Sequence, residues 1–361
     1  MNDPAEAFIA SVCRETFLSM WSYHGPRIPG SSKELCDVLV VCDPDVLIIS
    51  VKNIRLPASG ATALAVQRWH RKAVADSCKQ IRGAERVLAG ALEVFDRNGH
   101  PGLPLPPLSR RRVHRIAIAF GGGGVLYSAP LHNYGPQFHV LDERSWGTLV
   151  DELDTVSDFV TYLRDKEALL SPGSTLTFQG GEEDLLAHYL RSGREFPAGR
   201  HDFLVEAGQW DDYAALGGPR ERKRKEDANS YVVDGIIENL AQHFNRSLIT
   251  ADNPMRYVES GLRILARESR LHRRILANVL RPMVLTGRPY ARLFLPDWGL
   301  VYVLLVCPVS VSETQRRDEL NLRTLAAGSR RRYDEITHVE DLLRNRVPWA
   351  LGLTQHEQEA A

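Results

Sequence analysis

The stretch ELCDVLVVCDPDVLIISVK, residues 34–52, decides the fold expected for the first half of this chain. Two runs rich in Val, Ile and Leu, 36–42 and 46–52, are separated only by the tripeptide Asp-Pro-Asp. Runs of this composition on either side of a short turn are typical of a β-hairpin. The sequence therefore predicts two neighbouring antiparallel strands.

Three kinds of polar side chain are expected at one end of this hairpin. Because side chains alternate along a strand, Asp37 lies on one face of the first strand, and Ser50 and Lys52 share a face of the second. Pairing through the short turn places Asp37 near the end where Ser50 and Lys52 lie. An acid on one strand and a lysine ending the next suit Mg²⁺-dependent phosphodiester cleavage. Carboxylates bind the hard cation, and the lysine helps to activate water or to stabilise developing charge.

The segments around the hairpin predict a mixed α/β layer. Asp3 and Pro4 give the start of a first amphipathic helix, with Phe8, Val12 and Leu18 at helical spacing. A Pro/Gly-rich loop is expected over 95–109. The predicted order is helix, two strands, long helix, two strands and helix, at residues 3–20, 36–42, 46–52, 61–92, 113–120, 138–141 and 145–170.

In these residues and this order, the chain resembles the PD-(D/E)xK nuclease superfamily. Asp37 takes the place of the family's metal-binding aspartate, and Lys52 takes the place of its lysine. The family commonly adds a glutamate from the first helix, for which Glu15 is the first choice and Glu6 the second. It sometimes adds a glutamine from the next helix, a place that Gln80 fits.

The resemblance covers about residues 3–145 and implies a restriction-endonuclease-like mixed sheet flanked by helices. It implies a metal-dependent endonuclease that acts on DNA, with RNA as an alternative, in prokaryotic defence. The implied cofactor is Mg²⁺ or Mn²⁺, bound by Asp37, Glu15 and Glu34. The implied catalytic set is Asp37, Ser50, Lys52, Glu15 and Gln80.

One position departs from the family pattern. The family places Asp or Glu two residues before the lysine, and this chain has Ser50, whose hydroxyl is a weak Mg²⁺ ligand beside a carboxylate. Three alternatives stay open: another acid such as Glu34 substitutes, metal affinity is low, or the site is inactive. In the last case the chain is a catalytically inactive nuclease-fold module that binds nucleic acid or a protein partner.

Beyond about residue 170 the sequence predicts a mainly helical region with a second β-hairpin. The expected helices are 182–192, 230–244 and 253–281, and the hairpin lies within 292–306. We therefore expect a nuclease-like domain over 1–170 and a helix-rich domain over 171–361. No motif in the second half carries recognisable chemistry.

Basic side chains form an arc on two of the predicted helices. On helix 61–92 the arc lies opposite the apolar one, as a solvated face would. On helix 253–281 the arc contains arginine alone, which favours binding to a phosphate backbone. The candidate nucleic-acid-binding residues are Arg68, Lys72, Lys79, Arg82, Arg263, Arg267, Arg270 and Arg274.

Composition narrows the class of protein. The 361 residues are 43% hydrophobic and 25% charged with a formal net charge of zero, so a nucleic-acid role depends on local basic patches. The five cysteines are an odd number and lie mostly inside apolar segments, which indicates reduced thiols, and the lack of a CxxC pair or of a Cys/His cluster with zinc spacing argues against a structural zinc. We expect a cytoplasmic protein with no membrane segment or signal peptide, and a protein partner or homo-oligomer stays open.

Overall fold

The computed structural model describes residues 3–56, 62–126, 138–170, 175–197, 199, 202–247, 254–286, 290–295, 300–305, 310–312, 314–315, 318–320 and 322–323. The chain forms two compact units. The first comprises Met1–Lys223 and Leu240–Ser269, and the second comprises Arg224–Asn239 and Arg270–Ala361. The boundary between these units does not lie near residue 170, where the sequence analysis placed it. Residues on both sides of position 170 belong to the first unit.

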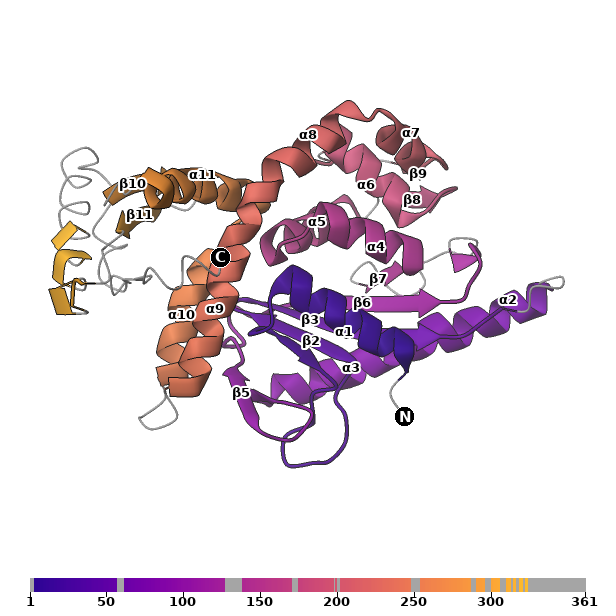
Figure 1. The fold of residues 1–361 in the computed structure, drawn as a ribbon. Coiled ribbons are helices and arrows are strands. Elements are labelled where there is room, and N and C mark those ends of the chain that lie inside the picture. The colour runs from indigo at the N-terminus through magenta and orange to yellow at the C-terminus, as the bar shows by residue number, and fades with distance from the viewer. Residues whose placement is uncertain are drawn as a thin grey trace. The chain divides into compact units, whose positions relative to one another are not determined.

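A five-stranded mixed sheet forms the centre of the first unit, in the order β1-β2-β3-β6-β7 (Figure 1). β1, β2 and β3 are antiparallel neighbours, and β6 and β7 continue the sheet parallel to β3. The predicted hairpin and mixed α/β architecture are confirmed. The strands are Ser22–His24, Val38–Cys42, Asp45–Asn53, Arg112–Phe120 and Phe138–Leu141.

Helices flank both faces of this sheet (Figure 1). α1, Pro4–Phe17, begins at the cap residue Asp3, whose side chain accepts a hydrogen bond from the Ala5 N–H. On the other face, α2 (Ala63–His70) and α3 (Asp76–Ala89) form one helix, joined by the π-helical turn Arg71–Ala75. The long helix predicted over 61–92 is thus confirmed, with a π turn that the sequence did not indicate.

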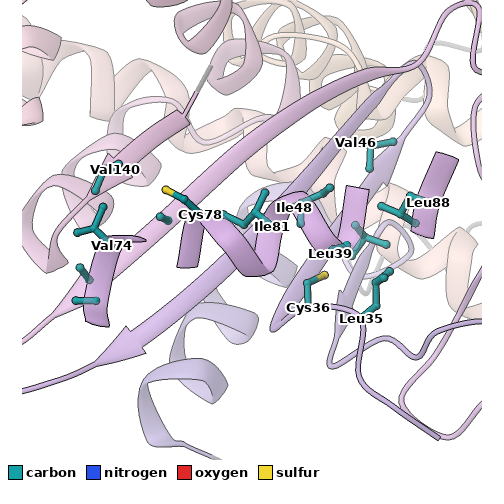
Figure 2. Close-up of a cluster of buried hydrophobic side chains, with 14 of the residues drawn as sticks. Leu35, Cys36, Leu39, Val46, Ile48, Val74, Cys78, Ile81, Leu88 and Val140 are labelled. Atoms are coloured by element: carbon teal, nitrogen blue, oxygen red, sulfur yellow. The ribbon is translucent and has the colours of Figure 1, made fainter. Parts of the chain in front are cut away.

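An apolar core lies between the sheet and the long helix (Figure 2). Leu39 and Ile48 are cross-strand partners on the hairpin and point toward Cys78 and Ile81 of α3. All four are almost completely removed from water. Burying side chains of this size stabilises the fold by about 1.5–3 kcal/mol each, so this core holds α3 firmly against the strands.

Two predicted helices are divided in the structure. The segment 145–170 forms α4, Glu143–Glu152, and α5, Val156–Leu169, because Thr155 caps a new helix by accepting from the Asp158 N–H. The segment 253–281 likewise forms α10, Pro254–Ala266, and α11, Arg270–Thr286.

The Pro/Gly segment 95–109, expected to be a loop, contains a strand. β5, Pro101–Pro104, pairs antiparallel with β4, Glu93–Phe95. A proline is compatible with a strand at an edge position, where its missing N–H is not needed.

The first unit also contains the predicted helix 182–192, which is confirmed, beside strands that the sequence did not predict. β8, Thr175–Phe178, pairs parallel with β9, Asp202–Val205, and α6, Glu182–Arg191, connects them. α7 spans Gln209–Ala215, and the charged run near residue 220 is helical in α8, Gly218–Asp227, which crosses into the second unit.

The second unit contains α11 and the hairpin of β10, Tyr290–Leu295, and β11, Leu300–Leu305, which confirms the second predicted hairpin. The 3₁₀ turn Ala228–Ser230 also belongs to it, and α9, Tyr231–Ser247, begins there and continues into the first unit. Within the part of the chain that the structure describes, no helix is both long and apolar enough to span a bilayer.

Candidate functional site

The hairpin brings Asp37 and Lys52 together at one edge of the sheet. β2 and β3 pair with Val38 opposite Ile49, and Asp37 and Ser50 are the next residues outward in that register. Lys52 lies two residues beyond Ser50 and therefore on the same face. The Lys52 Nζ atom lies 3.9 Å from Asp37 Oδ2. The expected convergence of a carboxylate and an ammonium group is present.

Asp37 is held by hydrogen bonds to both carboxylate oxygens. The residue is only 4% exposed. Its Oδ2 accepts from the Val51 backbone N–H at 2.5 Å, and its Oδ1 accepts from the Gln80 Nε2 at 3.2 Å. A buried carboxylate with two donors and a nearby ammonium group keeps one orientation.

Gln80 links Asp37 to Ser50. Its Oε1 accepts a hydrogen bond from the Ser50 hydroxyl at 3.2 Å, while its Nε2 donates to Asp37. α3 positions this amide because Ser77 and Ile81 face the core and leave Gln80 on the flank of the helix. The structure thus brings together four of the predicted residues: Asp37, Ser50, Lys52 and Gln80.

The acid of α1 whose charge interacts with this cluster is Glu6, the second choice, whereas Glu15, the first choice, lies away from it. Glu15 is exposed and accepts from the Ser11 hydroxyl one turn earlier on the same helix. The buried face of α1 carries Ile9, Cys13 and Phe17, whereas Phe8, which had been expected to face inward, is 56% exposed. At about 100° per residue, Glu6 lies near the centre of the buried face and Glu15 lies on the far side.

Carboxylates crowd this edge of the sheet. Burial, and then the negative charges of Asp37, Glu34 and Asp3, raise the pKa of Glu6 to about 7 against the lowering effect of Lys52. Partial burial and the Asp37 charge also raise the pKa of Glu34, while Arg97 and Lys52 lower it. The site therefore carries more negative charge than its cations balance.

His24 is a neighbour that the sequence did not reveal. It ends β1, directly opposite Val38, and the next residue, Gly25, donates its N–H to the Asp37 carbonyl. Burial lowers the pKa of His24, and the positive charges of Arg97 and Arg14 lower it further. A three-residue strand is too short to show alternation, so only its position before the hairpin could have suggested it.

The donor chemistry of this edge fits a hard divalent cation, because carboxylate oxygens predominate and carry uncompensated charge. The spacing, however, does not enclose one. Among the described residues, no group of three or more His, Cys, Asp or Glu side chains is placed to hold a metal ion. Of the predicted metal ligands, Asp37 and Glu34 lie at the edge and Glu15 does not.

The predicted basic arc of the long helix is exposed, as a solvated face would be. Its candidate residues Arg68, Lys72, Lys79 and Arg82 all face water, and Arg82 also covers the Phe138 ring at 4.8 Å. These side chains point away from the sheet, and Gln80 lies between that face and the core.

The predicted arginines of α10, α11 and the turn between them have partners within the protein. Each one makes an ion pair with a carboxylate of its own unit, and binding of nucleic acid by this arc stays a prediction. The pairs are Arg263 with Asp43 and Glu259, Arg267 with Asp45, Arg270 with Asp234, and Arg274 with Glu226 and Asp227.

Comparison with known proteins found no matching family model, no similar curated protein and no similar solved structure. The function of this chain is therefore argued from its own geometry.

Proposed function

We propose that this chain is a metal-dependent endonuclease of the PD-(D/E)xK type, acting on DNA, with RNA as the alternative substrate. The observation that carries the proposal is the 3.9 Å approach of Lys52 Nζ to the buried Asp37 carboxylate at a sheet edge. Few structural roles require a lysine beside a buried acid where further carboxylates crowd the same edge.

The order of elements supports a restriction-endonuclease-like fold. α1 precedes the antiparallel strands β1, β2 and β3, and the long helix then crosses to β6, which runs parallel to β3. This is the helix, strand, helix and strand context in which the family carries its motif. The resemblance extends to the proposal of a role in defence against foreign DNA.

Each residue of the cluster has a part in this proposal. Asp37, with Glu6 and Glu34, would hold Mg²⁺ or Mn²⁺, and a bound ion polarises the scissile phosphate and lowers the pKa of a water molecule. Lys52 places a positive charge where the phosphate gains negative charge. Gln80 acts as a positioning residue, because it fixes Asp37 through one end of its amide and Ser50 through the other.

A second candidate is a nuclease-fold module that binds nucleic acid or a protein partner without cleaving it. The observation that favours it is the closed hydrogen-bond network. Both Asp37 oxygens already accept hydrogen bonds, and the Ser50 hydroxyl donates to Gln80 where the family has an acid. In this case the cluster serves to fix the end of the hairpin.

A cleavage assay distinguishes the two candidates. Wild-type protein is incubated with supercoiled plasmid, single-stranded DNA and RNA, with Mg²⁺ or Mn²⁺ and with a chelator. The nuclease proposal expects metal-dependent cleavage that Lys52→Ala and Asp37→Asn each reduce by about a hundredfold or more, equivalent to roughly 2.7 kcal/mol in the barrier.

The matched control is Lys225→Ala, which removes an exposed lysine of α8. It should cleave as the wild type does. If all four proteins leave every substrate equally intact under both metals, the nuclease proposal fails, and binding of the same substrates then tests the second candidate.

A further inference from the structure

A hollow of about 430 Å³ lies at the opposite end of the same hairpin from Asp37. Its lining residues, which define the turn hollow, are Asp43, Pro44, Arg110, Arg112 and Arg263. All of them belong to the first unit. The hollow is separate from the Asp37 cluster, because the seven steps from Asp45 to Lys52 along β3 span roughly 23 Å at about 3.3 Å per step.

The lining is rich in positive charge. Three of its side chains are guanidinium groups and one is a carboxylate. Two further carboxylates outside the lining pair with these arginines, Asp45 with Arg112 and Glu259 with Arg263. The Asp43 carboxylate pairs with both Arg110, at 2.5 Å, and Arg263, at 3.1 Å. One carboxylate shared by two arginines leaves most of their N–H donors without a charged partner.

Arg112 also has an N–H donor without a partner. Its Nη2 donates to Asp45 Oδ2 at 2.8 Å, whereas its Nε is buried and has no hydrogen-bond partner. A buried N–H donor left unpaired costs about 1–3 kcal/mol. A ligand that accepted from this nitrogen would recover that cost.

The buried Asp45 carboxylate fixes the positions of Arg112 and Arg267 beside the hollow. Asp45 is completely buried and receives hydrogen bonds from Arg112, from Arg267 Nη1 at 2.8 Å and from His114 Nε2 at 3.0 Å. Arg267 also donates to the carbonyls of Cys42 and Asp43. These contacts already fix the turn. The side chain of Arg110 is 59% exposed, and the Arg112 Nε has no hydrogen-bond partner. Neither of these two groups is therefore needed to hold the turn.

We infer that the turn hollow binds a dianionic phosphate group, either free phosphate or the phosphate of a small monoester such as a nucleotide or sugar phosphate. Guanidinium forks match the oxygens of phosphate, and the N–H donors of these three arginines outnumber the carboxylate oxygens of their partners. The volume lies within the range of about 300–1,000 Å³ found for small-molecule pockets, which leaves room for the group that carries the phosphate. The site does not depend on the proposed nuclease function.

Isothermal titration calorimetry of the full chain at about 150 mM salt tests this inference, since screening at that ionic strength removes weak surface binding. The probes are inorganic phosphate, adenosine 5′-monophosphate, glucose 6-phosphate and adenosine. We expect at least one phosphate-bearing probe to bind with a Kd of about 1 mM or tighter, and adenosine not to bind. Equal affinity for inorganic phosphate and the esters identifies free phosphate as the ligand, and tighter binding of an ester identifies a monoester.

Two variants locate the binding. Arg110→Gln, at an exposed side chain that the fold does not need, should weaken the best probe by about tenfold, which corresponds to about 1.4 kcal/mol. The matched control Arg86→Gln, at an exposed arginine of α3, should bind as the wild type does. The inference is overturned if no phosphate probe binds, if adenosine binds as well as its monophosphate, or if the two variants behave alike. It is also overturned if an oligonucleotide without a terminal phosphate displaces the probe, because the ligand would then be a backbone diester.

Discussion

Each end of the β2–β3 hairpin buries an aspartate, Asp45 at the turn and Asp37 at the open end. The two carboxylates differ in how many positive charges surround them. At the turn, Asp45 is fully buried and faces Arg112, Arg267 and His114 within 3.0 Å. Although burial opposes it, hydrogen bonds from His114 and Arg267 hold the pKa of Asp45 well below its usual range. At this end, several basic side chains surround the one negative charge of Asp45.

At the open end, Asp37 has only a neutral amide, a backbone N–H and a lysine at 3.9 Å. Its neighbours Glu6 and Glu34 have raised pKa values, first because of burial and then because of like charge. A buried carboxylate with surplus cations serves stability, whereas crowded carboxylates with too few cations reduce stability and mark a site with a function. The comparison teaches that burial of an acid on one hairpin is accompanied by pKa shifts of opposite sign at its two ends, because the cations are distributed unequally.

The largest expected effect is the loss of stability in Asp45→Ala. Removing this carboxylate leaves Arg112, Arg267 and His114 partly buried without their counterion, which should lower the free energy of unfolding by about 3–5 kcal/mol. Urea denaturation measures it. The folded pKa lies below the ordinary value of 3.8, so the contribution is present above that pH and disappears as the pH falls further.

The control for this variant is Asp211→Ala. Asp211 makes a surface pair with Arg144 and its side chain is 69% exposed, so the change should cost at most about 1 kcal/mol. Equal losses in the two variants would show that the turn end is not the stabilising one.

A pH-dependent gain in stability is expected for Glu6→Gln. The folded pKa of Glu6 is about 7 and the ordinary value is 4.5, so its stabilising contribution is complete below 4.5 and is lost as the pH rises through 7. A shift of this size corresponds to about 3 kcal/mol, which solvent screening reduces to about 1 kcal/mol. At about pH 8 the variant should therefore be more stable than the wild type by about 1 kcal/mol.

Denaturant titrations at about pH 4 and about pH 8 measure this effect, which should be near zero at the lower pH. Glu15→Gln is the control on the same helix, and it should show no such difference between the two pH values. A Glu6→Gln gain that is the same at both pH values would remove the argument for crowded acids at the open end.

The hydrogen-bond chain through Gln80 should show a moderate coupling. A double-mutant cycle of Ser50→Ala and Gln80→Met is expected to give about 0.5–1.5 kcal/mol in the free energy of unfolding, because both variants break the same contact. Ser145→Ala, whose hydroxyl donates to Glu183, should combine additively with Gln80→Met. Additivity in the first cycle would mean that the amide does not join Ser50 to Asp37.

The smallest effect is expected on the outer face of the long helix. Lys72→Gln and Lys79→Gln should each change the free energy of unfolding by less than about 0.5 kcal/mol. If this face binds nucleic acid, each should also reduce the slope of log affinity against log salt by about 1. Arg267→Gln, by contrast, should lower stability and leave that slope unchanged, and the reverse pattern would favour the arginine arc as the binding face.

The hairpin and the cluster at its edge could be predicted because they depend on local rules. Alternation along the strands and one short turn determine that Asp37, Ser50 and Lys52 share a face. The choice between Glu6 and Glu15 depended instead on the phase of α1. Taking Phe8 and Val12 as the inner face selects Glu15, whereas the observed inner face of Ile9, Cys13 and Phe17 selects Glu6.

The remaining differences arise from contacts that sequence periodicity does not describe. The capping interaction of Thr155 was present as a Thr-x-x-Asp pattern and could have divided the helix predicted over 145–170. The pairs of Arg263 with Asp43 and of Arg267 with Asp45 could not be predicted, because these carboxylates lie more than two hundred residues earlier, beside the hairpin turn. Strands of four residues such as β8 and β9 are too short for a pattern.

The π-helical turn Arg71–Ala75 has a consequence for how the chain tolerates changes in length. Trp69 and Ile81 are both buried, although twelve residues at about 100° each would place them about 120° apart on a uniform α-helix. The π turn absorbs the equivalent of one added residue and reduces that angle to about 20°. Deleting one residue within the turn would thus restore a regular helix with both side chains still facing inward. The same deletion between Asp76 and Gln80 would rotate one end of the helix out of alignment and separate Trp69 from the strands or Gln80 from Asp37.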